Sequence, residues 1–76
     1  MDIQAKCIKA TDNHTEEPIG LVEGVKYDVK EISIGGWETD IKLHGSDQTY
    51  NSVNFEFYKD GEVYDIFEDS ELNPYL

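Results

Sequence analysis

Apolar and polar side chains alternate over several short runs of this 76-residue chain. The alternation is most regular over residues 37–44, where Trp37, Thr39, Ile41 and Leu43 share one parity and charged or polar side chains take the other. A period of two predicts a strand with one buried and one solvated face. Similar runs bounded by Gly, Pro or polar clusters predict further strands over residues 3–10, 25–34, 53–57 and 62–67.

The apolar parity changes once within the second predicted strand. Tyr27 and Val29 fall on one parity, whereas Ile32 and Ile34 fall on the other. One extra residue near Lys30–Glu31 would restore the phase, and this arrangement is a β-bulge, which bends a strand. Five short strands, one of them bulged, predict an all-β fold built as a small closed or nearly closed barrel.

The C-terminal tail, Glu68–Leu76, lacks this alternation. It carries Asp69, Ser70 and Pro74, which favour a short 3-10 turn near the C-terminus over another strand. Because so short a chain builds one hydrophobic core, we predict a single domain over residues 1–76.

Two predicted turns determine which side chains meet across the sheet. Two-residue turns at Gly35–Gly36 and Asp60–Gly61 each place two carboxylates opposite one another on the solvated face. Like charges in this position destabilise a sheet by up to about 1 kcal/mol. Either the carboxylates splay apart in water at little cost, or the face presents negative charge beside exposed aromatic rings. The predicted pairs are Glu31 with Asp40 and Glu56 with Asp65.

The charge of the chain excludes several classes of partner. Asp and Glu number 17 against six Lys and no Arg, and the formal net charge is −11. Direct binding to nucleic acid or to an anionic membrane needs clustered basic side chains, so neither is expected. No apolar run approaches the ~18 residues that span a bilayer. The first residues do not resemble a signal peptide, and we expect a cytoplasmic protein.

No group of residues indicates catalysis. Cys7 lies on the apolar parity of its strand, where a thiol acts as a small hydrophobic side chain, and His14 and His44 fall in turns. We therefore predict a protein that is not an enzyme and that holds no cofactor or metal. The polar segment 11–18 is typical of a solvated loop, with weak Ca²⁺ binding as the alternative. Its acidic candidates are Asp12, Glu16 and Glu17.

Two short motifs occupy the first half of the chain. Ala5–Ile8 contains Lys-Cys-Ile, and Leu21–Val29 contains Leu-x-x-Gly-x-x-Tyr-x-Val. Together they resemble small SH3-like barrels that are common in phages, prophages and other mobile elements. The resemblance implies a five-stranded SH3-like barrel and an accessory protein of a phage or mobile element, acting in a bacterial host cell. Eukaryotic relatives bind proline-rich peptides, but the inward parity of Trp37 and the residues Cys7–Lys9 match that groove poorly.

Two functions remain open. The first is an acidic module, a monomer, that occupies a basic surface of a host protein, in its strongest form as a nucleic-acid mimic or inhibitor. The second is a structural or housekeeping accessory protein, in one form a homo-oligomer, whose acidity serves solubility only. The candidate partner-binding residues are Glu31, Glu38, Asp40, Glu56, Tyr58, Asp65 and Phe67, together with the acidic loop residues Asp12, Glu16 and Glu17.

Overall fold

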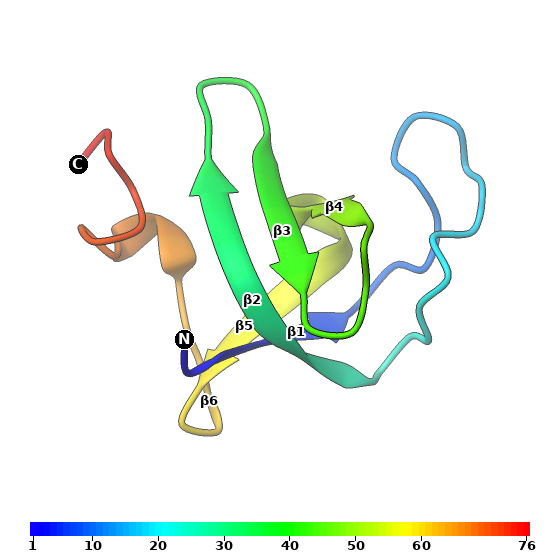
Figure 1. The fold of residues 1–76 in the computed structure, drawn as a ribbon, viewed down its shortest axis with the longest axis horizontal. Coiled ribbons are helices and arrows are strands. Elements are labelled where there is room, and N and C mark those ends of the chain that lie inside the picture. The colour runs from blue at the N-terminus through cyan, green and yellow to red at the C-terminus, as the bar shows by residue number, and fades with distance from the viewer.

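The computed structural model describes residues 1–76 and contains six strands and two single turns of 3-10 helix (Figure 1). The elements are β1 (Ile3–Cys7), β2 (Lys26–Ile34), β3 (Thr39–Leu43), β4 (Thr49–Asn51), η1 (Ser52–Asn54), β5 (Phe55–Lys59), β6 (Glu62–Val63) and η2 (Ile66–Glu68). No helix is long and apolar enough to cross a membrane.

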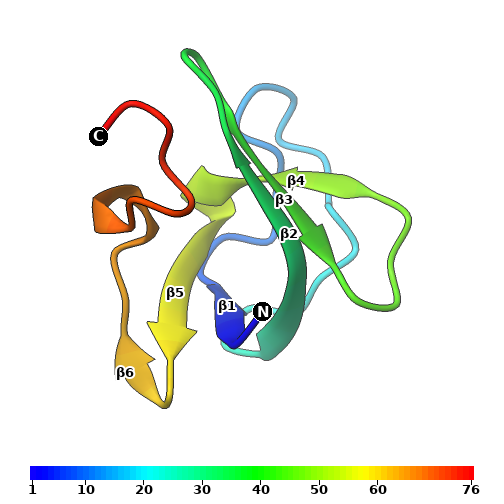
Figure 2. The same ribbon diagram turned by 60° about the vertical axis from the view of Figure 1, so that its left-hand side comes forward.

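The six strands form one antiparallel sheet in the order β4-β3-β2-β1-β5-β6. Strand β2 belongs to both halves of the sheet, because its first residues pair with β1 and its later residues pair with β3 (Figure 2). The all-β prediction is confirmed. The prediction of a closed or nearly closed five-stranded barrel is wrong, since β4 and β6 are free edges of an open sheet of six strands.

One additional strand explains the changed count, and the last predicted strand is shorter than expected. Strand β4 was not predicted, because its three residues are too few to show a period of two. The predicted last strand over residues 62–67 is shorter, since β6 ends at Val63 and η2 begins at Ile66. The expected 3-10 turn near the C-terminus is therefore present, but it starts earlier than the sequence indicated.

The bulge predicted in β2 is confirmed. Val29 lies opposite Leu43, but Glu31 lies opposite Lys42, so Lys30 is the extra residue on the β2 side. The bulge restores the inward direction of the side chains, and β2 contributes apolar residues to the core on both sides of it.

The core follows the predicted parity along β1 and β3. The buried apolar side chains are Ile3, Ala5, Cys7, Val29, Ile32, Ile41, Leu43, Tyr50, Phe55, Phe57 and Ile66. Tyr50 packs edge-to-face on Phe55, with ring centroids 6.0 Å apart. Cys7 is fully buried, as predicted, and burial raises the pKa of its thiol. Trp37, whose parity predicted an inward side chain, is exposed because it lies in a turn. The strand predicted over residues 53–57 starts at Phe55, and Val53 lies exposed on η1.

Candidate partner-binding surface

The turn between β2 and β3 is centred one residue later than the sequence suggested. The Gly35 amide donates to the Glu38 carbonyl oxygen at 2.9 Å, which makes Gly36 and Trp37 the turn residues. A Cβ atom on Gly35 would lie 2.8 Å from that oxygen, so only glycine fits there without a backbone shift. This close approach sets the turn, and the alternation of side chains gave no sign of it.

The new turn changes which charges meet on the solvated face. Glu31 lies opposite Lys42, not Asp40, and its carboxylate is 3.7 Å from the Lys42 ammonium nitrogen. Asp40 lies between Ser33 on β2 and Asn51 on β4. The predicted pair of like charges is therefore wrong, and an exposed ion pair takes its place.

The second hairpin has the predicted turn but not the predicted acidic pair. Asp60 and Gly61 both adopt positive φ, at 53° and 81°, which is typical of a tight hairpin turn. The register holds as far as Tyr64, whose amide donates to the Phe57 carbonyl oxygen at 2.9 Å. Asp65 then leaves the strand, and its carboxylate accepts the amide of Phe67 at 2.9 Å as the N-cap of η2.

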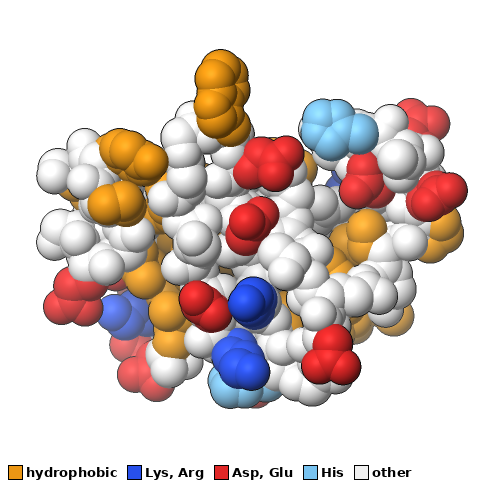
Figure 3. Space-filling model, turned by 45° about the horizontal axis from the view of Figure 1, so that its top comes forward, with side chains coloured by type: hydrophobic (Ala, Val, Ile, Leu, Met, Phe, Trp, Pro, Cys, Tyr) orange, Lys and Arg blue, Asp and Glu red, His pale blue; other side chains and the backbone are white.

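Glu56 faces basic neighbours instead of Asp65. It lies opposite Lys6 across the β1–β5 ladder and accepts a hydrogen bond from the Tyr58 hydroxyl. This hydrogen bond raises the pKa of Tyr58. The Lys26 ammonium nitrogen lies 4.0 Å from the centroid of the Tyr58 ring. Lysines therefore partly neutralise this face. Figure 3 shows that basic side chains also lie among acidic ones on another side of the molecule.

Most of the negative charge of the chain lies in two segments that are largely outside the sheet. Residues 11–24 carry four carboxylates and residues 60–76 carry six, and neither segment contains a lysine. We call these the acidic loop and the acidic C-terminal segment. They lie on opposite sides of the molecule, at the right and the left of Figure 1, with the β2–β3 hairpin between them.

The acidic loop is fastened at its base. Thr11 pairs with Pro18 in an isolated bridge, and the side-chain amide of Asn54 donates to the carbonyl oxygens of Lys9 and Thr11 at 2.8 and 2.7 Å. Asn54 is buried and belongs to η1, so this single turn connects the loop to the sheet. The alternation of side chains did not identify Asn54 as a structural residue. The one sign in the sequence is that this polar residue directly precedes the apolar side chains of β5.

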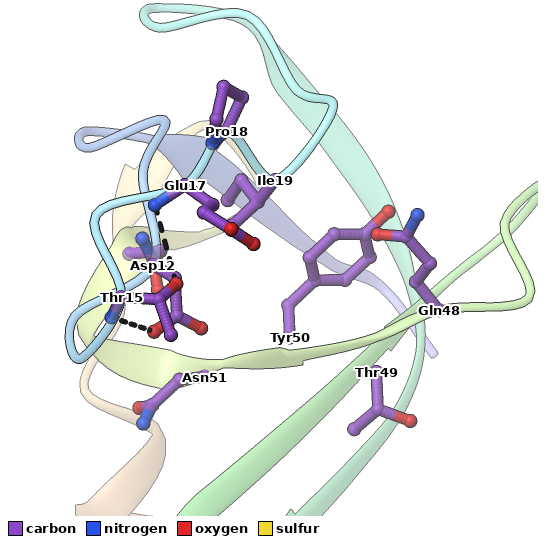
Figure 4. Close-up of a pocket in the computed structure, with 10 residues that line it drawn as sticks. Asp12, Thr15, Glu17, Pro18, Ile19, Gln48, Thr49, Tyr50 and Asn51 are labelled. Carbon is purple, nitrogen blue, oxygen red and sulfur yellow. Dashed lines mark hydrogen bonds between the residues drawn. The ribbon is translucent and has the colours of Figure 1, made fainter.

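The carboxylates of the acidic loop have different roles. Asp12 accepts the amides of His14 and Thr15 at 2.7 and 3.0 Å, and these hydrogen bonds from Thr15 and His14 lower its pKa. Asp12 therefore holds the loop in shape, whereas Glu16 and Glu17 are exposed. Figure 4 shows a polar hollow of about 190 Å³ between this loop and β4. No group of three or more His, Cys, Asp or Glu side chains is placed to hold a metal ion.

The carboxylates of the acidic C-terminal segment also have different roles. Asp69 accepts the Tyr64 hydroxyl at 2.5 Å and the Glu71 amide at 2.8 Å, and these bonds lower the pKa of Asp69 while the first raises that of Tyr64. Asp65 and Asp69 therefore shape the segment. Glu68 and Glu71 are exposed and accept no such hydrogen bond, whereas the exposed Glu62 lies opposite Lys59 in the β5–β6 ladder.

The tip of the β2–β3 hairpin carries an exposed aromatic side chain that the sequence pattern had placed in the core. Trp37 is 101% exposed. It borders an open hollow of about 540 Å³ together with Glu38, His14, Val53 and Phe67. Of the predicted partner-binding residues, the structure thus brings Glu38 and Phe67 to one hollow, while Glu31, Asp40, Glu56 and Tyr58 stay on the sheet.

The chain matches the family described as Bacteriophage T4 protein Y07B over residues 9–76. The chain belongs to that family. The match supports the phage origin that the two motifs implied, and it spans both acidic segments and the hairpin tip. No curated protein and no solved structure matches the chain.

Family membership supports the description of a phage accessory protein and leaves its partner to be inferred from the surface. The relation to SH3-like barrels rests on the sequence motifs, because the sheet is open and has six strands. The bulged second strand and the 3-10 turn near the C-terminus, both predicted from the side-chain pattern, are present.

Proposed function

We propose that this phage accessory protein is a non-enzymatic module that binds a basic surface of a host protein in the bacterial cytoplasm. The observation that carries the proposal is the concentration of carboxylates in two segments that contain no lysine. Opposite charges across an interface accelerate association and disfavour wrong partners. A need for solubility alone would be met by carboxylates spread over the whole surface.

The arrangement of charge favours contact through the acidic segments and not through the sheet. On the sheet, Lys42 pairs with Glu31 and Lys6 lies opposite Glu56. The narrower function, in which carboxylates imitate phosphates and inhibit a nucleic-acid enzyme, relied on a continuous acidic sheet face. Because lysines interrupt that face, we propose only that the protein binds a basic protein surface. Imitation of nucleic acid is one outcome of the test below.

Two variant sets with equal charge test the proposal. The C-terminal set makes the changes Asp60→Asn, Glu68→Gln and Glu71→Gln outside the strands, and the sheet set makes the changes Glu31→Gln, Asp40→Asn and Glu56→Gln. Both remove the same number of negative charges, so a difference between them reports the position of the charge. Wild type and both sets are immobilised, and the host proteins that they retain are quantified at low and high salt.

We expect wild type to retain a basic host protein that high salt releases, and we expect the C-terminal set to lose most of this retention while the sheet set keeps it. Equal loss in both sets would mean that net charge alone acts and would contradict the proposal. Release of the retained protein by added DNA would identify the mimic form. A salt-insensitive homodimer in sedimentation, with no retained protein, would favour the structural alternative.

A further inference from the structure

Strand β4 is an edge of the sheet, and its outer side pairs with no other strand. A free edge presents backbone N–H and C=O groups that can pair with another chain. Proteins commonly protect such an edge with lysine, proline, a bulge or a covering element. The residues of β4, Thr49–Asn51, include neither lysine nor proline, and their pairing with β3 contains no bulge. This edge is therefore open to a further strand.

The hydrogen bonds of the β2–β3 hairpin determine which backbone groups of β4 face outward. The Gly35 amide donates to the Glu38 carbonyl oxygen, so these two residues form a hydrogen-bonded pair. Hydrogen-bonded and non-hydrogen-bonded pairs alternate along an antiparallel ladder. The backbone groups of Asp40 therefore point to β2, and those of Ile41 point to β4. Tyr50 lies opposite Ile41 and points its own backbone groups back to β3.

The two residues that flank Tyr50 turn their backbone groups away from the sheet. The N–H groups of Thr49 and Asn51 and the carbonyl oxygen of Thr49 take part in no hydrogen bond outside the β3–β4 ladder. The Asn51 carbonyl oxygen differs, because Asn51 is the N-cap of η1 and an N-cap carbonyl accepts the first bond of its helix. At the other free edge, the same alternation turns only the groups of Val63 outward. The edge of β4 thus offers the longer row of unpaired groups.

The polar hollow of about 190 Å³ lies along this edge, between β4 and the acidic loop (Figure 4). In Figure 4, Tyr50 points from β4 toward the loop, whereas Thr49 points the opposite way. The side chains of an added strand would alternate in the same manner, so every second one would face the hollow. The residues that line the hollow are mostly polar, and they therefore suit polar side chains of the added strand.

Carboxylates lie on both sides of the edge. Asp12 and Glu17 line the hollow, and no lysine does. On the solvated face, Asp40 lies opposite Asn51, and the one nearby lysine, Lys42, is paired with a carboxylate of the sheet. An added strand that carries positive charge is therefore attracted to this edge, and an acidic one is repelled.

We propose that β4 binds an extended basic segment of the partner protein as an additional antiparallel strand. The outward backbone groups of Thr49 and Asn51 supply the hydrogen bonds, and the hollow receives alternate side chains of the segment. This inference rests on the proposed function, because it names the conformation of the basic segment that is bound and the edge that pairs with it. A second copy of the chain is disfavoured here, since two molecules with a net charge of −11 repel one another.

The probe is a short peptide of alternating Lys and Thr, in which Lys suits the solvated face and Thr suits the polar hollow. In an antiparallel pair, the residue that is hydrogen-bonded to Thr49 has its side chain on the same, solvated face, so the Lys amides of the peptide face β4. Two control peptides of equal charge carry N-methyl groups, one on the Lys amides and one on the Thr amides. Methyl groups on the Lys amides block pairing, whereas those on the Thr amides point away from β4.

Two variants of the protein test the same edge. Thr49→Pro removes an outward N–H but no hydrogen bond of the β3–β4 ladder, and proline is tolerated at such positions of edge strands. Thr49→Val keeps the N–H and a branched side chain, so it is the matched control. Circular dichroism confirms that each variant is folded, amide chemical shifts give the affinity, and hydrogen exchange reports which amides are protected.

We expect the amides of Thr49 and Asn51 to exchange faster than that of Tyr50 in the free protein, and the unmethylated peptide to slow their exchange. Methylation of the Lys amides and the change Thr49→Pro should each weaken the affinity by about tenfold or more, because each removes backbone hydrogen bonds. Methylation of the Thr amides and the change Thr49→Val should alter it little.

Equal binding of the two methylated peptides, equal binding by Thr49→Pro and wild type, or no binding of the unmethylated peptide would each overturn the inference. Protection of the Thr49 and Asn51 amides in the free monomer would also overturn it, because the edge would then not be free. A dimer of wild type in sedimentation that Thr49→Pro abolishes would assign the edge to a second copy and would contradict the inference as well.

The two proposals fail in different ways. If Thr49→Pro still retains the salt-sensitive host protein while the C-terminal set does not, the proposed function stands and the role of the β4 edge is wrong. If wild type retains no host protein in a salt-sensitive way, the proposed function is wrong, whatever the peptides do.

Discussion

The two hairpins of this sheet place their aromatic side chains in opposite environments. The β2–β3 hairpin is long and bulged, and it ends in a turn that leaves Trp37 entirely in water. The β5–β6 hairpin is short, and the chain after it turns back so that Ile66 is buried in the core and Tyr64 is half-buried. One hairpin thus completes the fold, and the other leaves a tip available for contact.

The largest effect that tests this comparison is at Ile66, on η2 shortly after the short hairpin. Ile66 is 1% exposed, so Ile66→Ala should lower the free energy of unfolding by about 2–5 kcal/mol through lost burial and a cavity. Val63, on β6 of the hairpin itself, is 69% exposed, so Val63→Ala should change the free energy of unfolding by less than about 0.5 kcal/mol. Urea unfolding followed by circular dichroism measures both, with Ile66→Val as a milder version if Ile66→Ala does not fold.

A smaller effect is expected at the turn of the long hairpin. Gly35→Ala places a Cβ atom 2.8 Å from the Glu38 carbonyl oxygen, and the backbone shift should cost about 1–3 kcal/mol of unfolding free energy. The neighbouring Gly36→Ala is the control, since its Cβ would meet only the Tyr75 hydroxyl at an ordinary 3.8 Å. Equal effects at the two glycines would contradict the turn described here.

The response to acid should depend on the segment after the short hairpin. The pKa of Asp69 is lower in the folded protein than its ordinary value of 3.8, because it accepts the Tyr64 hydroxyl and the Glu71 amide. Its contribution to stability is therefore complete above the unfolded pKa and is lost as the pH falls through the lower folded value. Tyr64→Phe should reduce the loss of stability between pH 5 and about pH 3.

The control for this pH effect is Tyr27→Phe. The Tyr27 hydroxyl accepts the Val22 amide at 2.9 Å and has no carboxylate partner, so its removal should lower stability by a similar amount at every pH. Urea unfolding at several pH values separates the two variants. If both lost stability in parallel, the Tyr64–Asp69 bond would not be the origin of the acid sensitivity.

The smallest effect concerns the charges on the sheet. The side chains of Glu31 and Lys42 are 59% and 53% exposed, so a double-mutant cycle with Gln at both positions should give a coupling of about 0.2–1 kcal/mol that weakens with salt. The corresponding cycle for Glu31 and Asp40 should give a coupling near zero. A repulsive coupling between Glu31 and Asp40 would instead support the register predicted from the sequence, in which these two residues face each other.

The sequence predicted those parts of the fold that depend on local side-chain parity. The buried faces of β1 and β3 and the bulge in β2 followed from alternation, and Asp60–Gly61 gave its turn because both residues tolerate positive φ. The turn at Gly36–Trp37 did not follow, since it depends on one backbone contact between Gly35 and Glu38.

The candidate surface was predicted less well for the same reason. Moving that turn by one residue brought Lys42 opposite Glu31 and took Trp37 out of the core. Asp65 does not face Glu56, because the chain leaves the strand before Asp65 and the Asp65 carboxylate accepts the Phe67 amide as the N-cap of η2. Glu38 and Phe67, two of the candidate residues, are exposed as the sequence predicted.

The attachment of the acidic loop through Asn54 has a consequence for the evolution of this protein. Since the buried amide holds both Lys9 and Thr11 at the start of the loop, the fold does not rely on the identity of most residues between Asn13 and Glu17. We expect this stretch to accept substitutions and insertions at little thermodynamic cost. Under the proposed function, the residues of this loop that contact a partner can therefore change while the scaffold remains as it is.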